Sequence, residues 1–243
     1  MCKPALAPRV ALLAALLAAL AALAAPTVAH ADGRLTALEQ RWLRLAWPVI
    51  SHARQQGLPL DIVVQPQPTP GLAPLAMAYV EGRCKLVLSM RGNAQAETTL
   101  DALPAGLLTP AVEAMAAHEL GHCWRYVRGA WHTVPAGFSA PAREIDDETL
   151  RRQWHEMQQT RREEGYADLV GLAWTQQRHP DRYAEVHAWL AAFRDDGGPA
   201  GHHHDTLRWV RLAAEPQVFA GSTSPFEAAW PLWQRGLQAD RAP

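Results

Sequence analysis

His118-Glu119-Leu120-Gly121-His122 is the stretch that decides how the rest of this 243-residue chain is interpreted. On an α-helix, residues four positions apart lie on one face, one turn from each other. His118 and His122 can therefore direct two imidazole nitrogens at a single metal ion, with Glu119 at the edge of the same face. A buried, hydrogen-bonded histidine pair in a core helix is the alternative interpretation.

A second stretch, Glu164-Gly165-Tyr166-Ala167-Asp168, supplies what a two-histidine site lacks. Glu164 is the candidate for the third protein ligand, and Asp168 lies one helical turn later on the same face. Asp168 could accept the other ring N–H of a ligand histidine and so fix its tautomer. Thr160-Arg161-Arg162-Glu163 fits a capping box that would start a new helix. That assignment uses Glu163 as a cap and leaves Glu164 free for the metal. Glu163 is the alternative ligand.

Together, H-E-x-x-H and E-x-x-A-D resemble the gluzincin zinc metallopeptidases, especially the compact prenyl-protein and membrane-quality-control zinc proteases, over roughly residues 75–215. The resemblance implies an α+β, predominantly helical, zincin-like fold in which a small antiparallel sheet packs on the active-site helix. It implies one Zn²⁺ per chain, bound by His118, His122 and Glu164, with Glu119 as general base and acid. It also implies that an edge strand, 85–89, binds the peptide substrate, although an ordinary sheet strand fits the sequence equally well.

The run His202-His203-His204 has three interpretations. It could be a second metal site or a solvated loop. By the family resemblance, one histidine ahead of a helix that carries an Arg, here Arg208, would stabilise the oxyanion. His203 and His204 are preferred over His202 for that catalytic role, and Asp205 is expected to cap the following helix, 206–214.

The N-terminus has the features of a signal peptide, residues 1–31: Lys3 and Arg9 precede an Ala/Leu-rich run, and Ala29-His30-Ala31 offers a cleavage site. An uncleaved anchor is the alternative, and only then is a membrane partner expected. Residues 32–243 are expected to form a single domain, exported to the periplasm or the extracellular space. Cys84 and Cys123 could then form a disulfide or remain two buried thiols.

The chain has a net charge of -1, which argues against nucleic acid as a partner. Hydrophobic periodicity and turn signals predict the following elements: helices 36–56, 110–128, 144–159, 160–177, 181–193, 206–214 and a terminal helix from Ser224; strands 60–64, 75–80 and 84–90; a loop over 91–106; and a loop over 131–142 that could roof the cleft. In the active-site helix, Thr109 is expected as N-cap and Pro110 as first helical residue.

The expected function is an exported zinc-dependent endopeptidase that acts on peptide or unfolded protein. The alternative is a zincin-fold binding or chaperone-like module without turnover. No Gly-x-Ser-x-Gly or other competing catalytic signature is present in the sequence.

Overall fold

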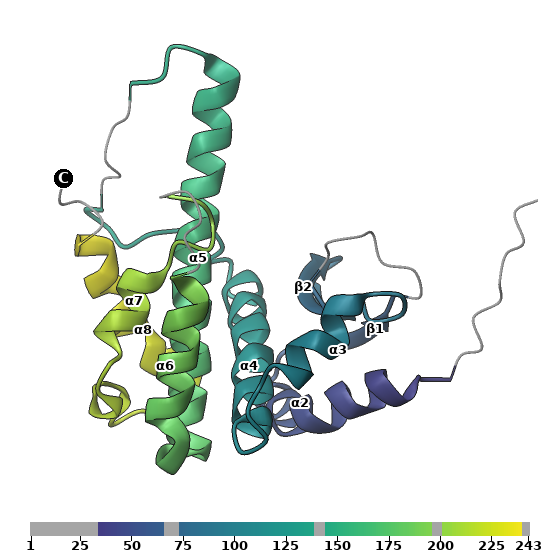
Figure 1. Ribbon diagram of the computed structural model, residues 1–243. Coiled ribbons are helices and arrows are strands. Elements are labelled where there is room, and N and C mark those ends of the chain that lie inside the picture. The colour runs from purple at the N-terminus through teal and green to yellow at the C-terminus, as the bar shows by residue number, and fades with distance from the viewer. Residues whose placement is uncertain (1–33, 66–72, 139–143, 196–200, 240–243) are drawn as a thin grey trace, which may run out of the picture. The chain divides into compact units, whose positions relative to one another are not determined.

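The computed structural model describes residues 34–65, 73–138, 144–195 and 201–239. The expected signal peptide, 1–31, lies outside these residues. From Leu35 onward the described residues form one compact unit, which is predominantly helical with a small sheet. Its elements, drawn in Figure 1, are α2 (Ala37–Gln55), β1 (Leu60–Val64), β2 (Leu75–Val80), β3 (Arg83–Leu88), α3 (Ala94–Asp101), α4 (Leu108–Val127), α5 (Glu148–Arg178), η2 (Pro180–Arg182), α6 (Tyr183–Arg194), α7 (Leu207–Leu212), η3 (Pro216–Phe219) and α8 (Pro225–Ala239).

The sheet is mixed, not antiparallel as expected. Its order is β1-β3-β2, with β2 antiparallel and β1 parallel to β3. Glu81 and Gly82 both have positive φ, at 52° and 75°, as a two-residue hairpin turn requires, and this tight turn fixes β2 against β3. The other edge of β3 is then open to β1. The stretch 85–89 therefore falls mainly on the central strand, and β2 is the edge strand on the opposite side from β1.

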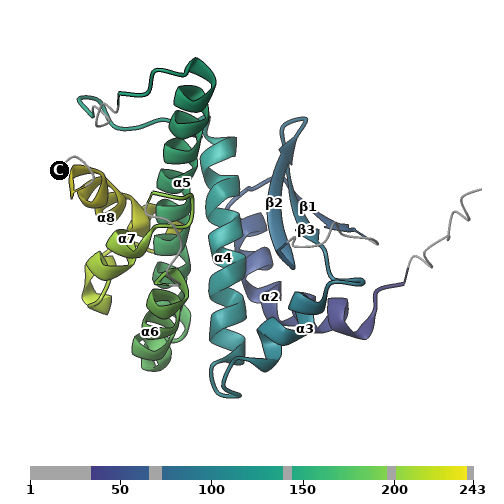
Figure 2. The same ribbon diagram turned by 45° about the horizontal axis from the view of Figure 1, so that its top comes forward.

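Helix α4 lies between two layers. The sheet and α2 pack on one side of it, and α5 packs on the other (Figure 2). A Cβ at Gly171 of α5 would lie 2.8 Å from the backbone oxygen of Ala114, and one at Gly121 would lie 3.2 Å from Val170. These small residues let α4 and α5 approach closely, which brings the side chains of the two helices within reach of each other.

The start of α4 differs from the expectation. Its N-cap is Leu107, and no side chain caps it, so Thr109 and Pro110 lie inside the first turn. The Leu107 N–H bonds to Pro104 O, and this turn allows the helix to begin earlier. Pro110 is tolerated because the first four N–H groups of a helix have no intrahelical acceptor.

Helix α5 is continuous over 31 residues, so the expected helix start at Thr160 is wrong. Asp147 is the N-cap, and its carboxylate accepts the N–H of Leu150. Glu163 caps nothing: its carboxylate accepts two hydrogen bonds from the buried Arg125 of α4. A capping box is a local signal, and here the tertiary ion pair prevails over it.

Two further local expectations fail. The segment expected as a loop contains α3, capped by Asn93; Trp42 donates to the carbonyl of Ala96 within it. Asp205 does not cap α7, because its carboxylate accepts the N–H of Gly201. Helix α3 contacts Trp42, which is far away in the chain, and Asp205 binds a backbone N–H of the preceding loop. Hydrophobic periodicity predicts neither contact.

Cys84 of β3 and Cys123 of α4 form a disulfide, which resolves the choice left open by the sequence. Both residues are fully buried. The bond joins the central strand to the turn of α4 that follows His122. Among the helices that the structure describes, none has the length and apolar character needed to cross a bilayer.

Candidate metal centre

The two motif histidines and Glu164 converge. His118 Nε2 lies 3.2 Å from His122 Nε2 and 3.2 Å from Glu164 Oε2, and His122 Nε2 lies 3.4 Å from Glu164 Oε1. Ligand atoms about 2.0–2.1 Å from a tetrahedral zinc ion would be roughly 3.3 Å apart. The three residues could therefore hold one metal ion, and the close α4–α5 packing is what brings them together.

Asp168 lies behind His118, as the sequence suggested. Its Oδ1 is 2.9 Å from His118 Nδ1, so the ring donates from Nδ1 to the carboxylate and turns Nε2 toward His122 and Glu164. The same carboxylate accepts two bonds from Arg194 of α6, at 2.7 and 2.9 Å, and one from the Thr206 hydroxyl. Asp168 is buried and held in place from three sides.

The electrostatics of the cluster favour positive charge. Burial would lower the pKa of His118, but hydrogen bonds and charges from Asp168 and Glu164 prevail and raise it to about 10. Burial would likewise raise the pKa of Glu164, but the two imidazoles hold it well below its usual range. A metal ligand must be deprotonated, so a bound cation would replace the His118 proton that these carboxylates stabilise. The donor set and its charge fit a divalent cation.

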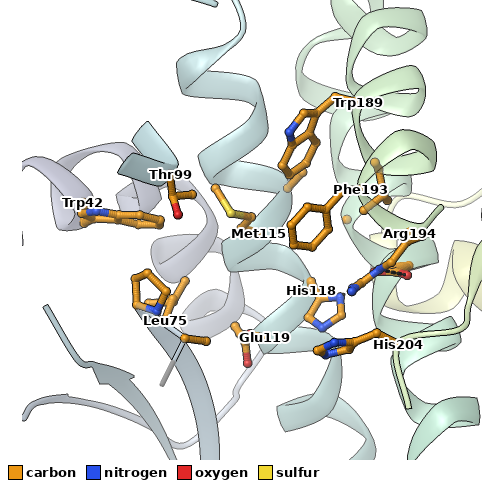
Figure 3. A pocket seen from close by; sticks show the side chains of 16 residues that line it. Trp42, Leu75, Thr99, Met115, His118, Glu119, Trp189, Phe193, Arg194 and His204 are labelled. Carbon is orange, nitrogen blue, oxygen red and sulfur yellow. Dashed lines mark hydrogen bonds and ion pairs between the residues drawn. The ribbon is translucent and has the colours of Figure 1, made fainter. Parts of the chain in front are cut away.

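Glu119 faces a cavity of about 200 Å³ beside the cluster (Figure 3). Burial raises the pKa of the Glu119 carboxyl. The cavity has a polar end formed by His118, Glu119, Arg194 and His204. Its remaining walls are mainly apolar and come from α2, β2, α4 and α6, including Trp42, Leu75, Met115, Trp189, Leu190 and Phe193.

Of the three consecutive histidines, His204 lies at the cluster. It lines the cavity, and its Nε2 is 3.5 Å from Glu164 Oε2. Burial lowers the pKa of His204 to about 4. His203 and His204 are both exposed, and their rings pack together with 4.1 Å between centroids, but His203 does not line the cavity. His202 accepts the backbone N–H of His204.

No protein-family model, curated protein or solved structure matches the chain. The residues of the site are therefore the basis on which a function can be proposed.

Sequence reasoning missed Arg194. Arg208 was the expected arginine, but it lies over the Trp209 ring, 5.9 Å from its centroid, whereas Arg194 bonds Asp168 and lines the cavity. Arg194 is the last residue of α6, so its position depends on how α6 packs against α5. In the sequence, Arg194 is simply an arginine at the end of a helix that carries aromatic residues. That pattern is too common to mark a functional residue.

The segment after α4 also reaches the site. Arg125 binds Glu163 and the Thr133 carbonyl, and Glu163 accepts the N–H of His132, so this segment is fastened to α4 and α5. The Trp131 ring meets the edge of the His122 ring, with centroids 5.5 Å apart. The sequence placed a cleft-roofing loop here but gave no role to Trp131; residues 139–142 of that loop lie outside the described part.

Proposed function

We propose that this protein is an exported zinc-dependent endopeptidase of the gluzincin type, with a zincin-like fold. One observation carries the proposal: the two imidazole nitrogens and the Glu164 carboxylate lie 3.2 to 3.4 Å apart at their nearest atoms, and Glu119, on the same helix as the two histidines, faces a cavity beside them. A metal site, a proton acceptor and room for a substrate thus occur together.

His118, His122 and Glu164 would hold one zinc ion per chain. Zinc in such a site polarises a carbonyl group and lowers the pKa of water toward about 7. Glu119 accepts the proton of the attacking water and delivers it to the departing amine. Burial raises the pKa of the Glu119 carboxyl, which makes it a stronger proton acceptor.

His204 is the proposed oxyanion donor. A neutral imidazole always carries one N–H, and the His204 ring stands at the polar end of the cavity, where the carbonyl oxygen would develop charge. His203 is not proposed for this role, because it does not line the cavity. Asp168 and Arg194 act indirectly, by fixing the orientation of His118.

The substrate would be a peptide or an unfolded protein in an extended conformation. Edge strand β2 lies against α4 and could pair with such a chain through backbone hydrogen bonds, in the role first expected for the central strand. The cavity walls would accept a large apolar side chain next to the cleaved bond. A disulfide in the core supports an oxidising, exported location, because such bonds persist there.

The test is Glu119→Gln. Cleavage of an unfolded protein should fall by about 10²–10⁴-fold while one zinc ion per chain stays bound, because the variant keeps all three ligands but loses the proton acceptor. Glu113→Gln is the matched control: Glu113 is a buried carboxylate of the same helix that contacts Trp174 and His179 instead of the site. Undiminished cleavage by the Glu119 variant would refute the proposal. Zinc binding with no cleavage by the unmodified protein would favour the binding module.

A further inference from the structure

Three stacked rings extend from the edge strand toward the metal centre. Tyr79 of β2 stacks on Tyr126 of α4, with centroids 5.0 Å apart and planes 11° apart. Tyr126 stacks in turn on Trp131, at 3.9 Å and 14°. We call Tyr79, Tyr126 and Trp131 the aromatic row. Its Trp131 end contacts the candidate ligand His122, so the row adjoins the site directly.

The row and the cavity lie at opposite ends of one stripe of α4. Met115, His118, His122 and Tyr126 follow each other at intervals of three or four residues, which places them on one face of the helix. Met115 lines the cavity, the histidines form the candidate centre, and Tyr126 belongs to the row. The stripe spans roughly 16 Å at the rise of an α-helix.

Edge strand β2 follows the same course (Figure 2). Leu75 lines the cavity and Tyr79 stacks in the row, so the strand passes the metal centre between them. Four strand residues cover about 13 Å, and residues at even spacing face the same side. A peptide paired along β2 would therefore present side chains four positions apart to the cavity and to the row.

The exposure of the row is consistent with a binding surface. Tyr79 is 36% exposed, and its neighbour Val80 is 49% exposed. Exposure alone decides nothing, because Trp47 of α2 is 49% exposed as well. The row differs from Trp47 in its position: one of its rings belongs to the edge strand, and another contacts the candidate ligand His122.

We propose that the aromatic row binds an aromatic side chain of the polypeptide substrate, four residues from the apolar side chain that enters the cavity and on the other side of the cleaved bond. This inference rests on the proposed peptidase function. The stacked rings offer ring edges and the outer face of Tyr79, which suit edge-to-face or offset contact with another aromatic ring.

The test uses a series of fluorogenic peptides. Each carries one Leu to set the register in the cavity and one Phe placed three, four or five residues away across the cleaved bond. The unmodified protein should cleave the four-residue spacing about three- to tenfold more efficiently in kcat/KM than the other two, as expected for one aromatic contact. Tyr79→Ala should remove this preference, and Tyr79→Phe, which keeps the ring, should retain it.

Trp47→Ala is the matched control, since it removes an exposed aromatic ring from α2 and should leave the spacing preference intact. Equal cleavage of all three spacings by the unmodified protein would overturn the aromatic row and leave the peptidase proposal standing. If no peptide is cleaved, the peptidase proposal fails. The affinities of the Glu119→Gln variant for the same peptides then test whether the aromatic row binds the Phe side chain. Tighter binding of the four-residue spacing that is lost with Tyr79→Ala supports this role, and equal binding of all three spacings overturns it.

Discussion

At the scale of single residues, four glutamates of α4 and α5 differ only in what faces them. Glu113 accepts bonds from Trp174 and His179, Glu163 pairs with Arg125, Glu164 meets two imidazoles, and Glu119 faces the cavity. Ion pairs, hydrogen bonds and burial each change the environment of a carboxylate in a different way. The chemistry available to each glutamate is thus set by its neighbours.

Asp168 gives a prediction at this scale. Asp168→Asn should weaken zinc binding about 10- to 100-fold, because the acceptor that orients His118 loses its charge and its fit to Arg194. Competition with a chromophoric zinc chelator measures the affinity, and circular dichroism checks that the variant is folded. The Glu113→Gln variant should bind zinc as the unmodified protein does. Equal affinity in the Asp168 variant would mean that this contact does not tune the site.

At the scale of elements, the site depends on how closely α4 and α5 pack and on how the sheet is fixed to α4. Gly121 and Gly171 permit the close packing of the two helices. The Cys84–Cys123 disulfide fixes the sheet to α4, one residue beyond His122. The local capping signal at Thr160 was overruled by a contact of this kind, the Arg125–Glu163 pair.

At this scale, we predict that the disulfide between β3 and α4 stabilises the fold. Replacing both Cys84 and Cys123 by Ala should lower the free energy of unfolding by about 3–4 kcal/mol, since the bond closes a loop across a sequence separation of 39. Urea denaturation of the variant and the unmodified protein measures the difference. The unmodified protein, unfolded and refolded with reductant present, should show a similar loss. An unchanged midpoint would show that the bond adds nothing to stability.

At the scale of the whole molecule, stability depends on pH through a buried pair that joins α2 to the segment after β3. Glu39 of α2 is fully buried, closes a capping box with Thr36, and binds Arg91 beyond β3 at 2.7 Å. Burial would raise the pKa of Glu39, but the bonds from Arg91 and Thr36 lower it below its ordinary value. The stabilisation is therefore present above the unfolded pKa, about 4.3, and is lost as pH falls through the lower folded value.

Glu39→Gln tests this linkage. The variant should be less stable than the unmodified protein by about 1–3 kcal/mol at pH 7, because it loses bonds to a charged partner. The gap should narrow as pH falls below about 4.3, where the unfolded carboxyl takes up a proton, and should close as pH passes the lower folded pKa, where the native carboxylate is protonated too. Urea denaturation across a pH series provides the measurement. A gap that stays constant down to pH 2 would contradict the linkage.

The sequence by itself determined the elements with strong periodicity and the residues of the candidate centre. The spacing of His118 and His122 implies a shared helix face whatever surrounds it, and Glu164 with Asp168 follows the same rule. Strands 60–64 and 75–80 and the end of α4 are confirmed because turn and cap signals there are local.

Only the tertiary structure decided the direction of β1, the identity of the edge strand, the place of Arg194, the position of His204 rather than His203 at the cavity, and the aromatic row. The physical reason is the sequence distance over which each kind of interaction acts. Helix periodicity is fixed within a few residues, whereas strand order and inter-helix contacts join segments that are far apart in the chain. Which of those pairings forms depends on the packing of the complete core, to which each residue contributes a small part.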